Sequence, residues 1–167
     1  MNATASTFLS EPADLKIEWA TAKNVAPFGT LLEPGEDGTP FGALDATLEL
    51  SGGTPRLYIM TLRARPLMVE RITRHKAVTQ CLASMEGQDW LIVLAPPGET
   101  PDLARLKALR FTGRQALCML VGTWHAGPLL LAEQCHFLNL ELSDTNIVDH
   151  ETVKLRTSYA LLPDTVG

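Results

Sequence analysis

MEGQDWLIVLAPPGETPD, residues 85–102, shows the pattern from which the fold is predicted. An apolar run at 90–95 lies here between two clusters rich in glycine, proline and acidic residues. These residue types favour turns, because their backbones adopt or enforce conformations that end regular structure. A short apolar run between turns, without polar alternation, is typical of a β-strand that is buried on both faces. The stretch therefore predicts a strand enclosed between two layers of the protein.

Short apolar runs separated by turn residues recur along the whole chain. Further turn clusters lie at 33–42 and 51–55. The other predicted strands are RLYIMTL at 56–62, VTQCLASM at 78–85, ALCMLV at 116–121 and HFLNLEL at 136–142, the last with one apolar and one partly polar face. Short helices are expected only at 21–25 and 102–109. Many short strands with few helices predict an all-β fold, either a sandwich or a small barrel.

The length of 167 residues suits one domain with a substantial core. We expect a flexible N-terminal segment at 1–14, a single domain at 15–160 and a C-terminal tail at 161–167. The net charge of −5 argues against a nucleic-acid partner, because such partners favour a basic surface. Small molecules and other proteins remain as partners.

The three cysteines, Cys81, Cys118 and Cys135, have no Cys-x-x-Cys spacing. Their odd number and spacing argue against a disulfide framework and a zinc site, and predict buried free thiols. The first residues carry neither a basic stretch nor a long apolar stretch, and no run reaches the roughly 18 apolar residues that span a bilayer. We therefore expect a cytoplasmic protein without a membrane partner.

Polar and ionisable residues interrupt the predicted strands at 73–80, 122–125 and 143–150. On an inward face, such residues either complete the hydrogen bonding of the structure or line a cavity. The interior mouth of a small β-barrel is the usual place for a ligand. These three stretches are therefore the candidates for a site.

The same stretches carry a resemblance to a known family. RHKAVTQCLASMEGQDWLIVLAPP at 74–97, GTWHAGPLLL at 122–131 and HFLNLELSDTNIVD at 136–149 resemble the ureidoglycolate lyase family, also called ureidoglycolate hydrolase, in order and spacing. NVAPFGTLLE at 24–33 is similar to the opening segment of that family. The matching positions are Arg74, His75, Gln80, Trp124, His125, Asp144 and Asp149.

The chain departs from the family pattern at several positions. Thr73 stands where the family has glutamate, and Lys76 stands where it has proline. Ala126 stands where a second histidine normally follows the Trp-His pair, and apolar residues at 118–121 replace a polar run.

The resemblance implies a cupin-type double-stranded β-helix, which is a jelly-roll barrel, and a homodimer. It implies a carbon–nitrogen lyase of the amidine-lyase class that splits ureidoglycolate into glyoxylate and urea during allantoin breakdown, with nickel as a divalent metal. This cleavage requires that the substrate hydroxyl lose a proton and that the leaving nitrogen gain one. A metal would lower the pKa of the hydroxyl as a Lewis acid, and a histidine could carry the proton.

His75 and His125 are accordingly predicted as catalytic residues and, together with Gln80, as metal ligands. Neither histidine has the His-x-His spacing that places two imidazoles on one strand face, and two histidines with one amide make a small ligand set. Each of these three residues has the alternative of completing hydrogen bonds inside the structure. His136 is expected to be a strand-end residue.

Arg74, Gln80 and Trp124 are predicted to bind the substrate. Arg74 would pair with the substrate carboxylate, a role for which Arg63 and Arg65 also compete. Trp124 has the alternative of packing in the core. Asp144 and Asp149, outside this group, are expected mainly to stabilise turns.

Two classes of function remain open from the sequence. The first is a lyase acting on ureidoglycolate or a related small acid. The second is a cupin-like protein that binds a different, more apolar molecule without catalysis, because Ala126 and residues 118–121 make the expected cavity less polar. Convergence of His75, Gln80 and His125 on one solvent-reachable cavity would distinguish the two classes.

Overall fold

Residues 11–162 are described in a computed structural model, and they form strands with only short helical segments. The helical segments are α1 (Ala22–Val25), the 3-10 turn η1 (Leu103–Arg105) and α2 (Thr145–Val148). The strands are β1 (Ala13–Trp19), β2 (Gly29–Leu32), β3 (Pro55–Arg63), β4 (Met68–Arg74), β5 (Gln80–Ser84), β6 (Trp90–Ala95), β7 (Lys107–Phe111), β8 (Ala116–Met119), β9 (Trp124–Leu130), β10 (Gln134–Leu142) and β11 (Glu151–Leu162).

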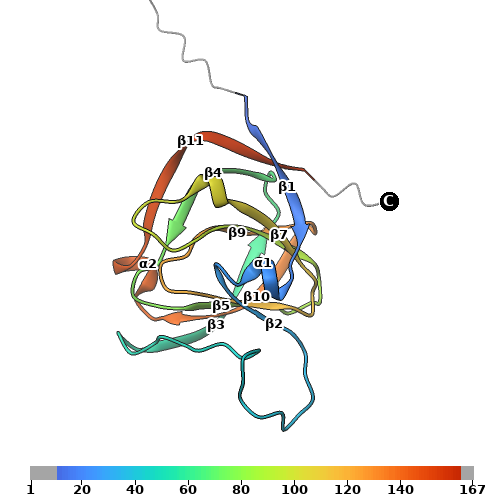
Figure 1. The fold of residues 1–167 in the computed structure, drawn as a ribbon, viewed down its shortest axis with the longest axis vertical. Helices are drawn as coiled ribbons and strands as arrows, with labels where there is room; N and C mark the ends of the chain where they lie inside the picture. The colour runs from blue at the N-terminus through green and yellow to red at the C-terminus, as the bar shows by residue number, and fades with distance from the viewer. Residues whose placement is uncertain (1–10, 163–167) are drawn as a thin grey trace, which may run out of the picture.

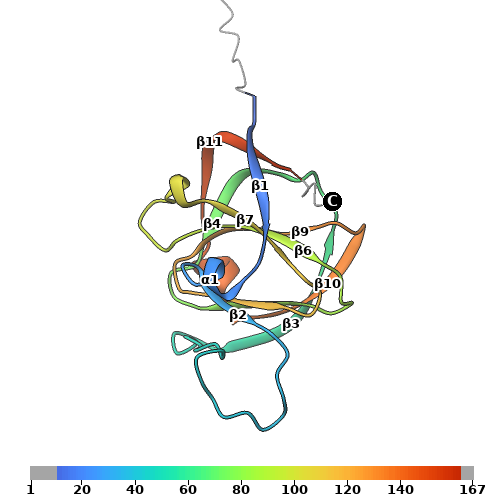
Figure 2. The ribbon, with the colours of Figure 1, turned by 45° about the vertical axis from the view of Figure 1, so that its right-hand side comes forward.

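The strands form two layers that lie one above the other in Figure 1. The first layer has the order β1-β11-β4-β9-β6-β7, and it closes into a barrel because β1 also pairs with β7. The second layer is a sheet with the order β2-β8-β5-β10-β3. The long connection between β2 and β3 extends away from this sheet in Figures 1 and 2.

The order of strands β3 to β10 identifies the topology. These strands run β3-β10-β5-β8 in the sheet and β4-β9-β6-β7 in the barrel. Successive strands cross between the two layers except at the β6–β7 hairpin, so most strands pair with partners distant in sequence. Two such interlocked Greek keys make a jelly roll, the fold of cupins. The prediction of an all-β cupin-type fold with one or two short helices is confirmed.

Two hydrophobic cores result, one on each face of the barrel wall. Strand β6 belongs to both, since Trp90, Ile92 and Leu94 point to one core and Leu91 and Val93 to the other. The first core, between the two layers, is the jelly-roll interior, and the second lies inside the closed barrel. This double burial explains why the run at 90–95 is apolar on both faces.

Most of the predicted elements lie within two residues of the observed ones. The strands expected at 56–62, 78–85, 90–95, 116–121 and 136–142 correspond to β3, β5, β6, β8 and β10. The helix expected at 21–25 is α1, whose N-cap Thr21 accepts a hydrogen bond from the backbone of Asn24.

The helix predicted at 102–109 is wrong. Asp102 caps only the short turn η1, and residues from Lys107 onward form strand β7 instead. Ala108 and Leu109 are fully buried on opposite faces of the barrel wall. Pairing with β6 and β1 therefore decides the conformation of this segment, because it buries both faces of β7. A two-turn helix on the surface would leave one face exposed.

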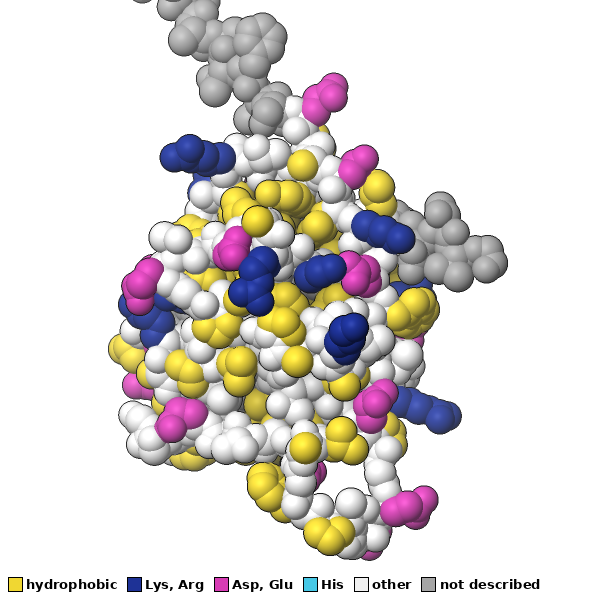
Figure 3. All heavy atoms as spheres, in the orientation of Figure 1, with side chains coloured by type: hydrophobic (Ala, Val, Ile, Leu, Met, Phe, Trp, Pro, Cys, Tyr) yellow, Lys and Arg dark blue, Asp and Glu magenta, His cyan; other side chains and the backbone are white. Residues whose placement is uncertain are grey.

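The first and last strands lie near the two ends of the described residues. Strand β1 begins at Ala13 and β11 ends at Leu162, two residues beyond the expected limits at each end. Most of the N-terminal segment and of the C-terminal tail lies outside the described residues. Within residues 11–162, no helix has the length and apolar character needed to cross a membrane. On the face shown in Figure 3, acidic and basic side chains are interspersed among apolar ones.

Candidate functional site

A small cavity, too narrow in this structure to hold a water molecule, lies at one end of the jelly-roll interior. Its wall includes three of the residues singled out from the sequence, His75, Gln80 and His125. The complete wall is His75, Val78, Gln80, Met119, Leu120, Thr123 and His125. The structure therefore brings the two histidines and the glutamine together, and each of the three residues is at most 9% exposed.

Strand pairing explains this convergence. His75 directly follows β4, and Thr73, two residues before it, pairs with His125 on β9. Gln80 begins β5 and pairs with Met119, the last residue of β8. The cavity thus lies where β4 and β9 of the barrel wall face β5 and β8 of the sheet.

Two backbone carbonyls orient the imidazole rings. His75 Nδ1 lies 2.5 Å from the carbonyl oxygen of Asp149, and His125 Nδ1 lies 3.2 Å from that of Thr123. A carbonyl oxygen only accepts hydrogen bonds, so each Nδ1 carries the proton and donates it. In a neutral ring with this arrangement, Nε2 is the nitrogen that can accept a hydrogen bond or a proton. The ring centroids of the two histidines are 5.1 Å apart.

Burial keeps His125 neutral. Desolvation, followed by the proximity of His75, lowers the pKa of His125 from 6.5 to about 4, and the hydrogen bond to Thr123 opposes this only partly. At neutral pH the ring is therefore uncharged and offers Nε2 as an acceptor.

A buried carboxylate on β10 fixes the side chain of Gln80. Glu141 is fully buried and accepts hydrogen bonds from Gln80 Nε2 (2.9 Å), the Tyr58 hydroxyl (3.0 Å) and Asn146 Nδ2 (3.2 Å). Burial raises the pKa of Tyr58, so its hydroxyl remains a donor. Because the amide nitrogen of Gln80 is bound to Glu141, its carbonyl oxygen is the atom left to act as an acceptor at the cavity.

Asp149 and Gly122 hold the loops that carry the site. The carboxylate of Asp149 accepts hydrogen bonds from the backbone nitrogens of Lys76 (2.6 Å) and Ala77 (2.8 Å). Gly122 has a φ of +82°, which favours glycine, and its nitrogen donates to the His75 carbonyl over 2.7 Å. Asp149 thus stabilises a turn, although the turn is one distant in sequence rather than its own.

Trp124 and Arg74 lie on the other face of the barrel wall. Trp124 is fully buried in the barrel core and donates from Nε1 to the Gly98 carbonyl over 3.0 Å. The guanidinium of Arg74 lies 4.7 Å from the centre of the Trp124 ring and bonds to Glu151, Glu99 and the same carbonyl. Its buried donors are thus bound to protein groups, and neither residue lines the cavity.

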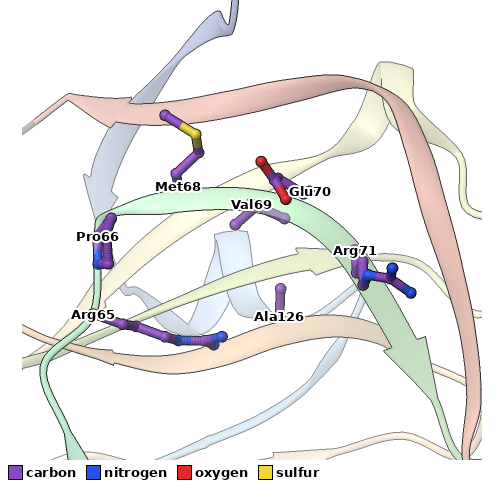
Figure 4. Close-up of a pocket in the computed structure, with 7 residues that line it drawn as sticks. All are labelled: Arg65, Pro66, Met68, Val69, Glu70, Arg71 and Ala126. Carbon is purple, nitrogen blue, oxygen red and sulfur yellow. The ribbon is translucent and has the colours of Figure 1, made fainter.

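A second, more open hollow also lies away from the histidine cavity. It is bordered by Arg65, Arg71 and Ala126 together with Pro66 and residues 68–70. Figure 4 shows the Arg65 side chain extending toward Ala126, while that of Arg71 points away. Ala126 follows His125 on β9 and therefore faces the opposite side of the wall. Arg65 is thus separated from His125 by the barrel wall.

The donors at the cavity do not fit a tight transition-metal site. Two imidazoles and one neutral amide are present, while the nearby carboxylate of Glu141 is occupied by three donors. Within residues 11–162, no three His, Cys, Asp or Glu side chains converge so as to hold a metal ion. The predicted metal role of His75, Gln80 and His125 therefore stays a prediction.

Sequence reasoning missed three residues near the site. Glu141 and Tyr58 form the network behind Gln80, and the ring of His150 lies 5.6 Å from that of His75. Glu141 had a signal, because it occupies the partly polar face of 136–142, and this face is the buried one. His150 also had a signal, because it ends the polar stretch at 143–150, whereas Tyr58 had none, since its hydrogen-bond partners lie on a strand distant in sequence.

The sequence is similar to known proteins of one family. The family model described as Ureidoglycolate lyase matches residues 12–161. Proteins named ureidoglycolate lyase from Pseudomonas putida (strain W619) and Azotobacter vinelandii are 30% and 28% identical over 143 residues, covering 77% of this chain and 84% and 85% of the relatives. One from Pseudomonas fluorescens (strain SBW25) is 30% identical over 145 residues, covering 78% of this chain and 86% of the relative.

Among solved structures, RmlC from Streptococcus suis in complex with dTDP-D-xylose matches with a TM-score of 0.39 and 11% identity, over 56% of this chain and 46% of that chain.

The match to the family model reaches from β1 to β11 and includes every residue of the histidine cavity. The chain belongs to the ureidoglycolate lyase family.

Proposed function

We propose that the chain is a ureidoglycolate lyase, a carbon–nitrogen lyase that releases glyoxylate and urea in allantoin breakdown. Family membership supports the proposal, and one structural observation carries it. His75, Gln80 and His125 converge on one cavity, and Nδ1 of each histidine is bound to a backbone carbonyl, which leaves Nε2 as the nitrogen that can accept a proton. The alternative of a binding protein without catalysis is not favoured, because the family match spans nearly the whole chain.

The chemistry of ureidoglycolate explains why such acceptors are useful. Its central carbon carries a hydroxyl, a carboxylate and a ureido nitrogen. Removal of the hydroxyl proton lets the oxygen form the aldehyde C=O of glyoxylate, while the C–N bond breaks and its electron pair moves to nitrogen. A proton then completes urea, so the reaction has no net gain or loss of protons. A single imidazole that accepts and returns this proton is sufficient.

We assign the proton transfer to Nε2 of His75. His125 is the poorer carrier, because burial lowers its pKa to about 4 and so opposes the charged form. His125 Nε2 and the Gln80 carbonyl oxygen instead accept hydrogen bonds from the N–H groups of the substrate. Hydroxyl and ureido donors on the substrate thereby meet acceptors on the protein.

Binding of the substrate carboxylate and of a metal requires groups other than these three side chains. No cavity side chain carries a permanent positive charge. These residues are therefore assigned the proton transfer and not the binding of the substrate carboxylate. The donors at the cavity do not fit a tight transition-metal site, and the roles assigned here belong to side chains alone. Metal analysis of the purified protein tests the expectation of nickel.

The test is an assay of the purified protein with ureidoglycolate. We expect glyoxylate and urea to appear in equal amounts, and the rate to fall strongly in His75→Gln and His125→Gln. His136→Gln is the matched control, because His136 lies on β10, where its ring contacts Glu86 away from the cavity. Absence of both products, or equal loss in the control, would overturn the proposal.

A homodimer and a cytoplasmic location belong to the same proposal. Apolar side chains on the outer face of the sheet support a contact between copies, since Leu57 and Ile59 on the edge strand β3 are 62% and 55% exposed. Light scattering at micromolar concentration tests the association. A mass of 18.2 kDa, that of one chain, would contradict the dimer.

A further inference from the structure

Two of the three cysteines face each other across neighbouring strands. Cys81 on β5 and Cys118 on β8 are direct partners in the antiparallel ladder. Their neighbours in sequence, Leu82 and Met119, point into the jelly-roll core, so both cysteines point to the outer face of the sheet. The two thiols are close enough to interact with each other.

This placement satisfies the geometry of a disulfide. Residues directly opposite in an antiparallel pair have Cα atoms about 4.5–5.5 Å apart. A disulfide requires Cα separations of about 4.4–6.8 Å. The Cα separation typical of such a pair therefore lies within the range that a disulfide spans.

An oxidant has access to one member of the pair. Cys81 is partly exposed and borders an open hollow whose wall includes Phe41 and Leu48 from the β2–β3 connection. Cys118 is only 3% exposed and lies behind it. The third cysteine, Cys135, points into the jelly-roll core and bonds to Glu86 and Ser84.

We propose that Cys81 and Cys118 are an oxidisable dithiol that peroxide converts into a reversible cross-strand disulfide. Peroxide oxidises the thiolate form of one of the two cysteines to a sulfenic acid and is reduced to one water. The sulfur of the other cysteine then displaces the hydroxyl group as a second water, and the S–S bond forms as both thiols lose their protons. A thiol reductant restores the two thiols.

The test oxidises the folded full chain with hydrogen peroxide, alkylates the remaining thiols and measures the intact mass without reduction. We expect a loss of about 2 Da before alkylation and one alkylated thiol instead of three. Digestion with trypsin and a glutamyl protease, which cuts after Glu133 between Cys118 and Cys135, should yield a Cys81–Cys118 cross-link. Dithiothreitol should reverse the change.

Two variants make the result specific. In Cys118→Ser, Cys81 has no partner, so we expect Cys81 to gain about 32 Da as a sulfinic acid. Cys135→Ser, the matched control, should still form the cross-link. Three alkylatable thiols after peroxide treatment, or sulfinic acid on Cys81 in the unaltered protein, would overturn the proposal. Because the readout is thiol content, its outcome is independent of the lyase assay.

Discussion

The two faces of strand β9 lead into two different interiors. Trp124 points into the closed barrel, where it packs among apolar side chains and meets an arginine bound entirely to protein groups. His125, the next residue, points into the jelly-roll interior, where it meets His75 and Gln80 around a cavity. In the barrel interior, Trp124 and Arg74 are hydrogen-bonded to other protein groups. In the jelly-roll interior, the side chains at the cavity keep hydrogen-bond acceptors for a ligand. The barrel interior thus contributes mainly to stability, and the jelly-roll interior holds the residues assigned to the reaction.

Truncation of the barrel core should have the largest effect. Trp124→Ala removes a fully buried ring, and we expect the free energy of unfolding to fall by about 3–5 kcal/mol in denaturant titrations. Trp19→Ala is the control, because Trp19 also lies against an arginine but is 41% exposed. Similar losses in the two variants would remove the distinction between the two interiors.

Acid should weaken the jelly-roll interior through His125. The pKa of this residue is lowered from 6.5 to about 4 in the folded protein, so the unfolded chain binds more protons between these values. The stabilising effect of neutral His125 is complete above pH 6.5 and is lost as the pH falls to about 4, by up to about 3 kcal/mol. Unfolding free energies of the unaltered protein and His125→Gln, measured across this range, should differ in slope. Parallel curves would count against a buried neutral ring.

A smaller effect is expected from the network behind Gln80. Glu141→Gln replaces an acceptor of three hydrogen bonds by a group that cannot satisfy all three donors, which costs about 1–3 kcal/mol of unfolding free energy. The freed Gln80 amide should also raise KM for ureidoglycolate more than it lowers kcat. Tyr58→Phe, which removes only one donor, should change both quantities less. A larger effect of Tyr58→Phe would show that Glu141 does not position Gln80.

The sequence predicts the fold better than it predicts the site. The apolar run at 90–95 indicates burial on both faces because each alternate residue belongs to a different core. The region at 102–109 is misleading, since one capping aspartate and a short apolar pattern fit a helix until pairing with β6 and β1 is known.

Among the site residues, alternation along a strand predicts that Trp124 and His125 point to opposite faces, and the structure places them so. Hydrogen-bond partners from distant strands are not encoded locally, so the pairing of Arg74 with Glu151 and of Gln80 with Glu141 could not be predicted. Arg74 consequently looks like a carboxylate-binding residue in the sequence and is bound to protein groups in the structure.

The most direct test of the central claim compares turnover of ureidoglycolate by the unaltered protein and by His75→Gln at equal folded fraction. General acid–base transfer by one side chain contributes about 10²–10⁴-fold to a rate. The account predicts that kcat for glyoxylate release falls by about this factor while the thermal unfolding midpoint stays nearly unchanged. A kcat within about twofold of the unaltered value would contradict the assignment of the proton transfer to His75.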